Sequence, residues 1–183
     1  MNLSVKSLNS VYVADQITEI VRQQHVDPQN VVLEITESTA TTDIGVVLEN
    51  LARLRMKGFP LSIDDYGTGY SSLEQLSRIP FEELKIDQSF VTHAAKKEAA
   101  RVILESSLDM ARRLNLRAVA EGVETSGNWD LLVELKCDVA QGYYIARPMA
   151  GAAFIEWLDA WPRMTQSTSP QRRTGRGAVR PVA

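Results

Sequence analysis

Residues 62–73 read SIDDYGTGYSSL, in which a short apolar run ends in two adjacent carboxylates and is followed by a loop with two glycines. Asp64 and Asp65 can be interpreted as a turn, because Asp and Gly are common turn formers. They can also be interpreted as metal ligands at the end of a strand, because adjacent like charges are costly unless a cation compensates them. The rest of the chain decides between these two interpretations.

The composition indicates one ordinary domain. A chain of 183 residues with 44% hydrophobic residues is long and apolar enough to bury a normal core. No apolar run approaches the roughly 20 residues of a membrane span, and the N-terminus lacks a secretion signal. We therefore expect no membrane segment and a cytoplasmic location. The single Cys137 has no partner and is expected to be a buried apolar residue.

The charge is distributed unevenly along the chain. The formal charge of −3 becomes −8 for residues 1–162 once the five arginines of residues 163–183 are removed, because this tail contains no acid. An acidic body argues against binding of a nucleic-acid polymer. The tail is rich in Arg, Ser, Pro and Gly, so residues 163–183 are predicted to form a disordered basic tail.

Hydrophobic periodicity predicts that strands and helices alternate. The predicted strands are 2–4, 31–35, 60–64, 83–86, 117–120 and 139–145. The predicted helices are 15–24, 43–57, a short one from Ser71, 95–114, 126–136 and 151–161. This alternation is typical of a parallel sheet with right-handed crossovers, either a (β/α) barrel or a doubly wound sheet. No GxGxxG or Walker motif follows the first strand, which disfavours a nucleotide-binding doubly wound fold.

Each predicted strand carries one polar residue within it or directly after it. These residues are Asn2, Glu34, Asp64, Lys85, Glu121 and Gln141. A buried structural strand would be an uninterrupted apolar run, whereas a barrel enzyme places its working groups at the carboxyl ends of several strands. The pattern favours a TIM-like barrel of the α/β class, and it favours the metal interpretation of the paired aspartates.

The residue types at these strand ends indicate a site for hard cations. Four carboxylates would converge on one mouth, from Glu34, Asp64, Asp65 and Glu121. Oxygen ligands without a Cys or His cluster suit Mg²⁺ or Mn²⁺ rather than zinc. Two such ions about 3.5–4 Å apart activate a water and stabilise the leaving oxygen in an attack on phosphorus. The expected chemistry is hydrolysis of a phosphodiester.

Several short motifs occur in a fixed order along the chain. They are NLS at 2–4, VLEITES at 32–38, DDYGTGYSSL at 64–73, LKID at 84–87, AEGVE at 120–124 and QGY at 141–143. In this order they resemble the EAL domain family of cyclic di-GMP phosphodiesterases, over nearly all of residues 2–160. The resemblance implies a TIM-like barrel that hydrolyses the bacterial second messenger cyclic di-GMP to linear pGpG with Mg²⁺ or Mn²⁺.

The resemblance also implies roles for individual residues. The implied metal ligands are Asn2, Glu34, Asp64, Asp65 and Glu121. Lys85 is implied to orient the catalytic water, and Glu121 to assist its deprotonation. Gln141 would support the water shell of the metals, while Glu37 and Glu124 would support the loop after Asp65. Arg147 and Pro148 would lie at the substrate rim. The family further suggests a homodimer formed near the loop after Asp65.

The chain departs from the family in one respect. The Glu-Ala-Leu segment is absent, and six strands are predicted where the family barrel has eight. Residues 1–162 are therefore expected to form an EAL domain that lacks its N-terminal strand-helix-strand, with an open barrel and two unpaired sheet edges. We expect such a truncated domain to be weak or inactive alone, unless a missing N-terminal segment complements it.

Alternatives remain at this point. The chain can be a catalytically degenerate EAL module that binds cyclic di-GMP or a protein partner without hydrolysis. An unrelated metal-dependent barrel, such as an enolase-type lyase, would need a different ring of acids. Lys85 can also be a plain ion-paired strand residue, and Glu37 and Glu124 can be solvated acids or acids at a helix N-terminus.

Overall fold

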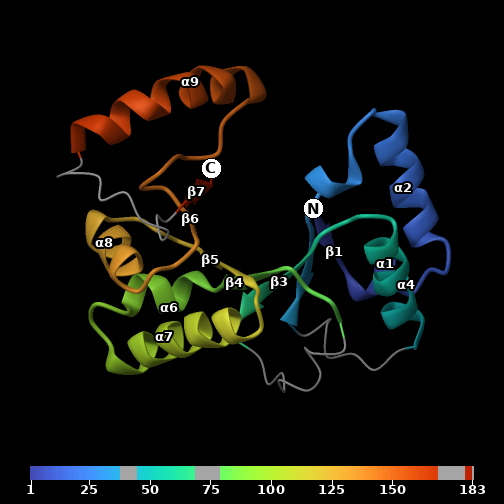
Figure 1. The fold of residues 1–183 in the computed structure, drawn as a ribbon, viewed down its shortest axis with the longest axis horizontal. Helices are drawn as coiled ribbons and strands as arrows, with labels where there is room; N and C mark the ends of the chain where they lie inside the picture. Colours follow the sequence, from blue (N-terminus) through green and yellow to red (C-terminus); the bar gives the residue numbers. More distant parts are fainter. Residues whose placement is uncertain (38–44, 69–78, 169–179, 183) are drawn as a thin grey trace.

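The computed structural model describes residues 1–37, 45–68, 79–168 and 180–182 and shows a single parallel sheet with helices packed beside it (Figure 1). Neighbouring strands follow the order of the chain. The strands are β1 (Asn2–Leu3), β2 (Leu33–Thr36), β3 (Leu61–Tyr66), β4 (Glu83–Ile86), β5 (Arg117–Ala120), β6 (Val139–Gln141) and β7 (Arg180–Val182). The two end strands do not pair with each other, so the sheet is not closed. The predicted α/β class with an incomplete barrel sheet is confirmed.

The helices connect successive strands, as the alternation predicts. They are α1 (Val5–Leu8), α2 (Val13–Gln23), the 3₁₀ helix η1 (Pro28–Asn30), α4 (Gly45–Met56), α6 (Gln88–His93), α7 (Glu98–Arg113), α8 (Ser126–Glu134) and α9 (Gly151–Thr168). The helix predicted from Ser71 lies outside the described residues. None of the described helices is long and apolar enough to cross a bilayer.

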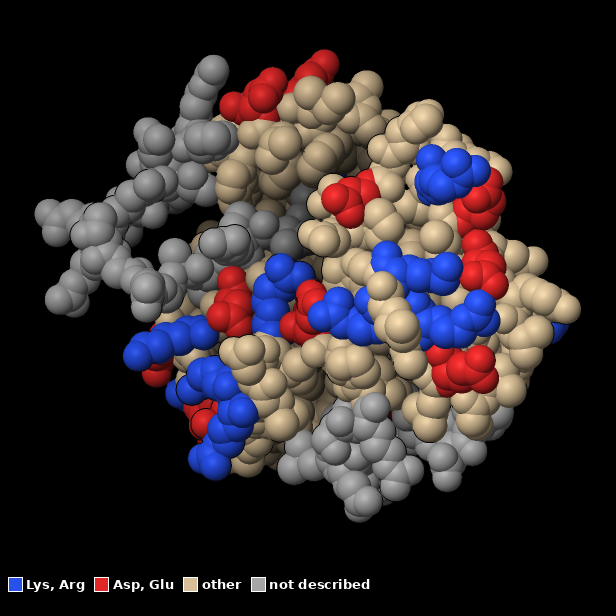
Figure 2. Space-filling view, turned by 45° about the vertical axis from the view of Figure 1, so that its right-hand side comes forward, with Lys and Arg blue, Asp and Glu red and all other residues tan. Residues whose placement is uncertain are grey.

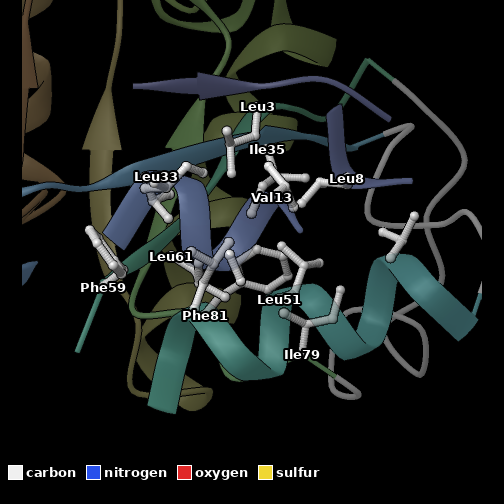
Figure 3. Packing of buried hydrophobic residues seen from close by; sticks show 14 of the residues in the cluster. Leu3, Leu8, Val13, Leu33, Ile35, Leu51, Phe59, Leu61, Ile79 and Phe81 are labelled. Carbon is white, nitrogen blue, oxygen red and sulfur yellow. The ribbon is translucent and has the colours of Figure 1, made fainter. Parts of the chain in front are cut away.

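Strand alternation separates an apolar face from a polar one. In β2, Leu33 and Ile35 are fully buried, whereas Glu34 and Thr36 between them are only half-buried. The apolar side chains of β1–β3 pack with α1, α2 and α4 in a first core cluster, which Figure 3 shows. A second cluster joins β4–β6 to α6, α7 and α8. Because the helices cover the apolar face, the opposite face of the sheet holds the polar side chains.

Local signals set several element ends. Helices α1 and α6 were not predicted. They begin after Ser4 and Asp87, whose side chains accept hydrogen bonds from backbone N–H groups of these helices. The predicted strand 139–145 is too long, because the chain turns after Gln141 and the N–H of Ile145 donates to the Gly142 carbonyl (3.0 Å). Cys137 is buried, as predicted, and burial raises its pKa to about 11.

The prediction that residues 163–183 form a disordered tail is wrong for two parts of that segment. Helix α9 continues to Thr168, and β7 pairs in parallel with β6, with Val139 opposite Arg180 and Gln141 opposite Val182. The edge of β6 presents backbone N–H and C=O groups that a further strand can pair with. Composition alone cannot reveal this, because the open edge exists only in the folded sheet.

Charged residues on the surface are mixed in sign. On the face shown in Figure 2, a row of basic side chains crosses the middle and acidic side chains border it. Ion pairs of this kind include those of Arg53 and Lys57 with Asp15, and that of Arg55 with Glu82.

Candidate metal centre at the carboxyl end of the sheet

The strand register brings the predicted site residues to one end of the polar face. Asn2 pairs with Glu34, Thr36 pairs with Asp64, and Ile86 pairs with Ala120, directly before Glu121. The strands are parallel, so the ends of β2, β3, β4 and β5 lie side by side. Residues far apart in the sequence therefore meet at one mouth.

Lys85 lies at the centre of this mouth. Its Nζ is 2.8 Å from Glu121 Oε1, 2.9 Å from Asp64 Oδ1 and 3.2 Å from Glu34 Oε1, and its side chain is only 7% exposed. Burial lowers the pKa of Lys85, but the hydrogen bonds to Asp64 and Glu121 more than offset this and raise the pKa above its ordinary value. The ammonium group is therefore charged and holds together the carboxylates of β2, of β3 and of the residue that follows β5.

Asp64, Asp65 and Glu121 form a group that can hold a cation. One oxygen from each carboxylate lies within 4.8 Å of the others. Neighbouring residues of a regular strand point to opposite faces, but Asp65 has φ +55° and the pairing of β3 with β4 shifts register between Ile63 and Tyr66. This irregularity turns the side chain of Asp65 toward the same site as that of Asp64.

The titration behaviour of this group reflects an excess of negative charge. Burial raises the pKa of Asp65, and the charges of Asp64 and Asp87 raise it further. Burial likewise raises the pKa of Glu121, Lys85 lowers it, and Asp64 and Asp65 raise it again. A bound cation would relieve this repulsion. The donor atoms are carboxylate oxygens without His or Cys, which fits a hard divalent cation.

The sequence analysis assigned no role to Asp87, whose charge acts on Asp65. It follows β4 directly and its Oδ1 accepts from the N–H of Ser89 (3.0 Å) at the start of α6. The signal was present in the sequence, because Asp87 is a further acid just beyond a strand that already carries Lys85. The cap that Asp87 forms on α6 was not foreseen, because no helix was predicted between residues 87 and 95.

The loop after Asp65 is held by Glu37. The N–H of Gly67 donates to Glu37 Oε2 (3.0 Å), and Glu37 is 4% exposed. Gly67 has φ +100°, and a Cβ at this position would lie 2.7 Å from the ring of Phe90. The backbone next to the acid group is therefore fixed on two sides, by a buried carboxylate and by a packed ring.

The remaining predicted residues lie at the end of β6 or in the segments that follow β5 and β6. Gln141 ends β6, and its carbonyl accepts from the N–H of Val123 (3.0 Å). Arg147 is exposed and its guanidinium lies 4.6 Å from the centre of the Tyr143 ring. Pro148 and Glu124 are also exposed. None of these described contacts joins the four residues to the acid group.

Asn2 lies beside Glu34 but is exposed. The terminal amine of Met1 donates to the Val32 carbonyl (2.8 Å), and the N–H of Glu34 donates to the Met1 carbonyl (2.8 Å). These bonds fix the backbone of β1 at the edge of the sheet. Backbone pairing therefore places Asn2 opposite Glu34 in the neighbouring strand.

Comparison with known proteins gives a consistent result. The family model described as EAL domain matches residues 1–148. The cyclic di-GMP phosphodiesterase RocR of Pseudomonas aeruginosa is 36% identical over 156 residues, which cover 85% of this chain and 40% of RocR. This chain thus spans less than half the length of that curated relative.

Solved structures show the same likeness. The complex of the Pseudomonas aeruginosa MucR phosphodiesterase with c-di-GMP has a TM-score of 0.80 and 38% identity, covering 84% of this chain and 62% of that one. The manganese/cy-diGMP complex of Klebsiella pneumoniae BlrP1 has a TM-score of 0.75 and 30% identity, covering 81% and 38%.

Proposed function

Because the chain belongs to the EAL domain family, we propose that it is a metal-dependent phosphodiesterase that hydrolyses cyclic di-GMP to linear pGpG. The observation that supports this most is the convergence of Asp64, Asp65 and Glu121 within 4.8 Å, with Lys85 bonded to two of them. The names of RocR and of the MucR complex point to the same substrate. The neighbour crystallised with manganese supports a divalent cation.

We assign the cation site to the carboxyl-end acids. Asp64, Asp65 and Glu121 would hold Mg²⁺ or Mn²⁺, with Glu34 and Asn2 as further ligands of a two-metal site. When bound, the metals would supply an activated water and neutralise charge on the phosphate oxygens. The register that places Asn2 and Glu34 side by side supports this assignment.

The chain's own residues would carry the remaining steps. Lys85 would orient the attacking water through its charged ammonium. Glu121 would accept the proton of that water, a role for which its raised pKa suits it. The water oxygen forms a bond to phosphorus, one ester P–O bond breaks, and the departing ribose oxygen takes up a proton.

Other residues would position these groups. Glu37 would fix the loop after Asp65 through the N–H of Gly67, Gln141 would support the water shell, and Glu124 would support the neighbouring loop. Arg147, with Pro148, would meet the anionic nucleotide at the rim. We further propose a cytoplasmic protein that acts as a homodimer.

The test is turnover of cyclic di-GMP by the purified chain in Mn²⁺ or Mg²⁺, with pGpG measured by chromatography. Asp64→Asn is expected to lower turnover about 100-fold or more, because it removes a ligand charge. Asp15→Asn is the matched control, since Asp15 is an acid paired with Arg53 and Lys57 outside the site. Binding of cyclic di-GMP without turnover would contradict the proposal and identify a binding module instead.

A further inference from the structure

Glu121 is the first residue of a segment, residues 121–125, that belongs to no helix or strand. The position of this segment therefore depends on its contacts with other elements. The N–H of Glu121 donates to the Ile86 carbonyl (3.1 Å), and that of Val123 donates to the Gln141 carbonyl (3.0 Å). A Cβ on Gly122 would lie 2.4 Å from Gln88 Cβ, so the loop packs tightly against the start of α6. We call residues 121–125 the Glu121 loop.

A buried amide closes the far end of the Glu121 loop. Asn128 is 6% exposed, and its Oδ1 accepts from the N–H of Thr125 (3.2 Å), from Thr125 Oγ1 (2.8 Å) and from the N–H of Glu124 (3.4 Å). Its Nδ2 donates to the Val91 carbonyl in α6 (3.2 Å). One side chain therefore joins the end of the loop to the helix that follows β4.

This link joins the two segments that follow the strands of the site's ion pair. Lys85 belongs to β4, which leads into α6, and Glu121 follows β5, which leads into the loop. Their charged atoms are 2.8 Å apart. We propose that Asn128 is a positioning residue that fixes Glu121 relative to Lys85 and to the cation site. Its consequence for catalysis rests on the proposed function, but its consequence for the loop does not.

Position 128 requires an amide, because its partners need both a hydrogen-bond acceptor and a hydrogen-bond donor. A carboxylate at position 128 would keep the acceptor for Thr125 and Glu124 but would face the Val91 carbonyl without a proton. Asn128→Asp therefore cuts the link to α6 while it leaves the helix cap in place. Groups that support a metal ligand in this way typically change metal affinity or activity about 10–100-fold when they are altered.

Asn50 provides a matched control. It is 1% exposed, and its Nδ2 donates to the carbonyls of Leu8 (2.8 Å) and Ser10 (2.9 Å), so it also joins a helix to a neighbouring segment through a buried amide. It lies in α4, in contact with α1 and outside the Glu121 loop. Asn50→Asp makes the same chemical change at the same depth.

The experiment measures two quantities on the wild type, Asn128→Asp and Asn50→Asp. The first is amide hydrogen exchange of peptides covering residues 119–125 in metal-free buffer, and the second is the dissociation constant for Mn²⁺ alone. Both variants are expected to lower the unfolding temperature. Only Asn128→Asp is expected to speed exchange of the Glu121 loop about tenfold or more and to weaken Mn²⁺ binding about 10–100-fold.

Unchanged exchange and Mn²⁺ affinity in Asn128→Asp, or equal changes in Asn50→Asp, would overturn the inference. A wild type that binds Mn²⁺ without hydrolysing cyclic di-GMP would overturn the proposed function. The amide hydrogen exchange and the Mn²⁺ affinity of the variants would still decide the inference about Asn128. If the wild type binds no Mn²⁺, the assignment of the cation site is wrong. The amide exchange rates alone would then decide whether Asn128 fixes the Glu121 loop.

Discussion

Charged side chains occupy both ends of the same strands, but their charges balance at only one end. At the amino end, Glu83 of β4 accepts from Ser62 Oγ (3.0 Å) and pairs with Arg117 at 2.9 Å. At the carboxyl end, two residues further along β4, Lys85 faces three carboxylates with Asp65 close by. One acid meets one base at the first end, whereas one base meets four acids at the second.

This difference distinguishes a structural ion pair at the amino end from a candidate cation site at the carboxyl end. A buried acid with a guanidinium and a hydroxyl has its hydrogen-bonding capacity used and needs nothing from solution. Burial raises the pKa of Glu121 and Asp65, the neighbouring carboxylates raise it further, and a cation would relieve this excess of negative charge. The contrast also explains why the polar face of one sheet can serve stability at one end and chemistry at the other.

The largest expected effect comes from Lys85→Met at the carboxyl end. Turnover of cyclic di-GMP is expected to fall about 10²–10⁴-fold, because the ammonium group that we propose orients the water is lost. Steady-state kinetics in Mn²⁺ measure this. Lys57→Met, which removes a lysine paired with Asp15, should leave turnover unchanged. Equal losses in both variants would show that the two lysines do not differ in role.

A smaller effect is expected at the amino end. Arg117→Met leaves Glu83 with Ser62 as its remaining partner and is expected to lower the free energy of unfolding by about 1–3 kcal/mol. Urea unfolding measures this change. Turnover per folded molecule should stay within twofold of the wild type. A loss comparable to that of Lys85→Met would break the distinction between the two ends.

The smallest expected effect is a pH dependence of stability without metal. The folded-state pKa of Glu121 is raised above 4.5, so its contribution to the free energy of unfolding is complete below that pH. The contribution is lost as pH rises through the raised pKa. The wild type should therefore lose stability relative to Glu121→Gln as pH increases from 4 toward neutrality, in urea unfolding with chelator. A difference that grows in the opposite direction would contradict the account.

The sequence predicts strands β1 to β6 and the convergence of polar residues at their carboxyl ends, because both depend on local pattern. Glu34, Lys85 and Glu121 interrupt or follow short apolar runs, and parallel strands bring such positions to the same end. The pairing of Lys85 with three carboxylates could not be predicted from the sequence, because it depends on the register of four strands. The left-handed backbone of Asp65 was likewise hidden, because Asp-Asp looks the same in a regular strand and in a bulge.

Elements set by tertiary context were also missed. Helices α1 and α6 are short and depend on caps at Ser4 and Asp87 rather than on a long apolar period. Strand β7 depends on the edge of β6. Asn128 looks like an ordinary polar residue in a helix, and its buried contact with Val91 appears only once α6 and α8 are packed together.

The central claim is that the carboxyl-end acids require a divalent cation to act on a phosphodiester. The most direct measurement is conversion of cyclic di-GMP to pGpG by the chelator-treated chain as Mn²⁺ is added back. The account predicts no conversion without Mn²⁺ and a rate that rises to a plateau as the site fills. Conversion that proceeds equally with and without Mn²⁺, or that stays absent at saturating Mn²⁺, would contradict it.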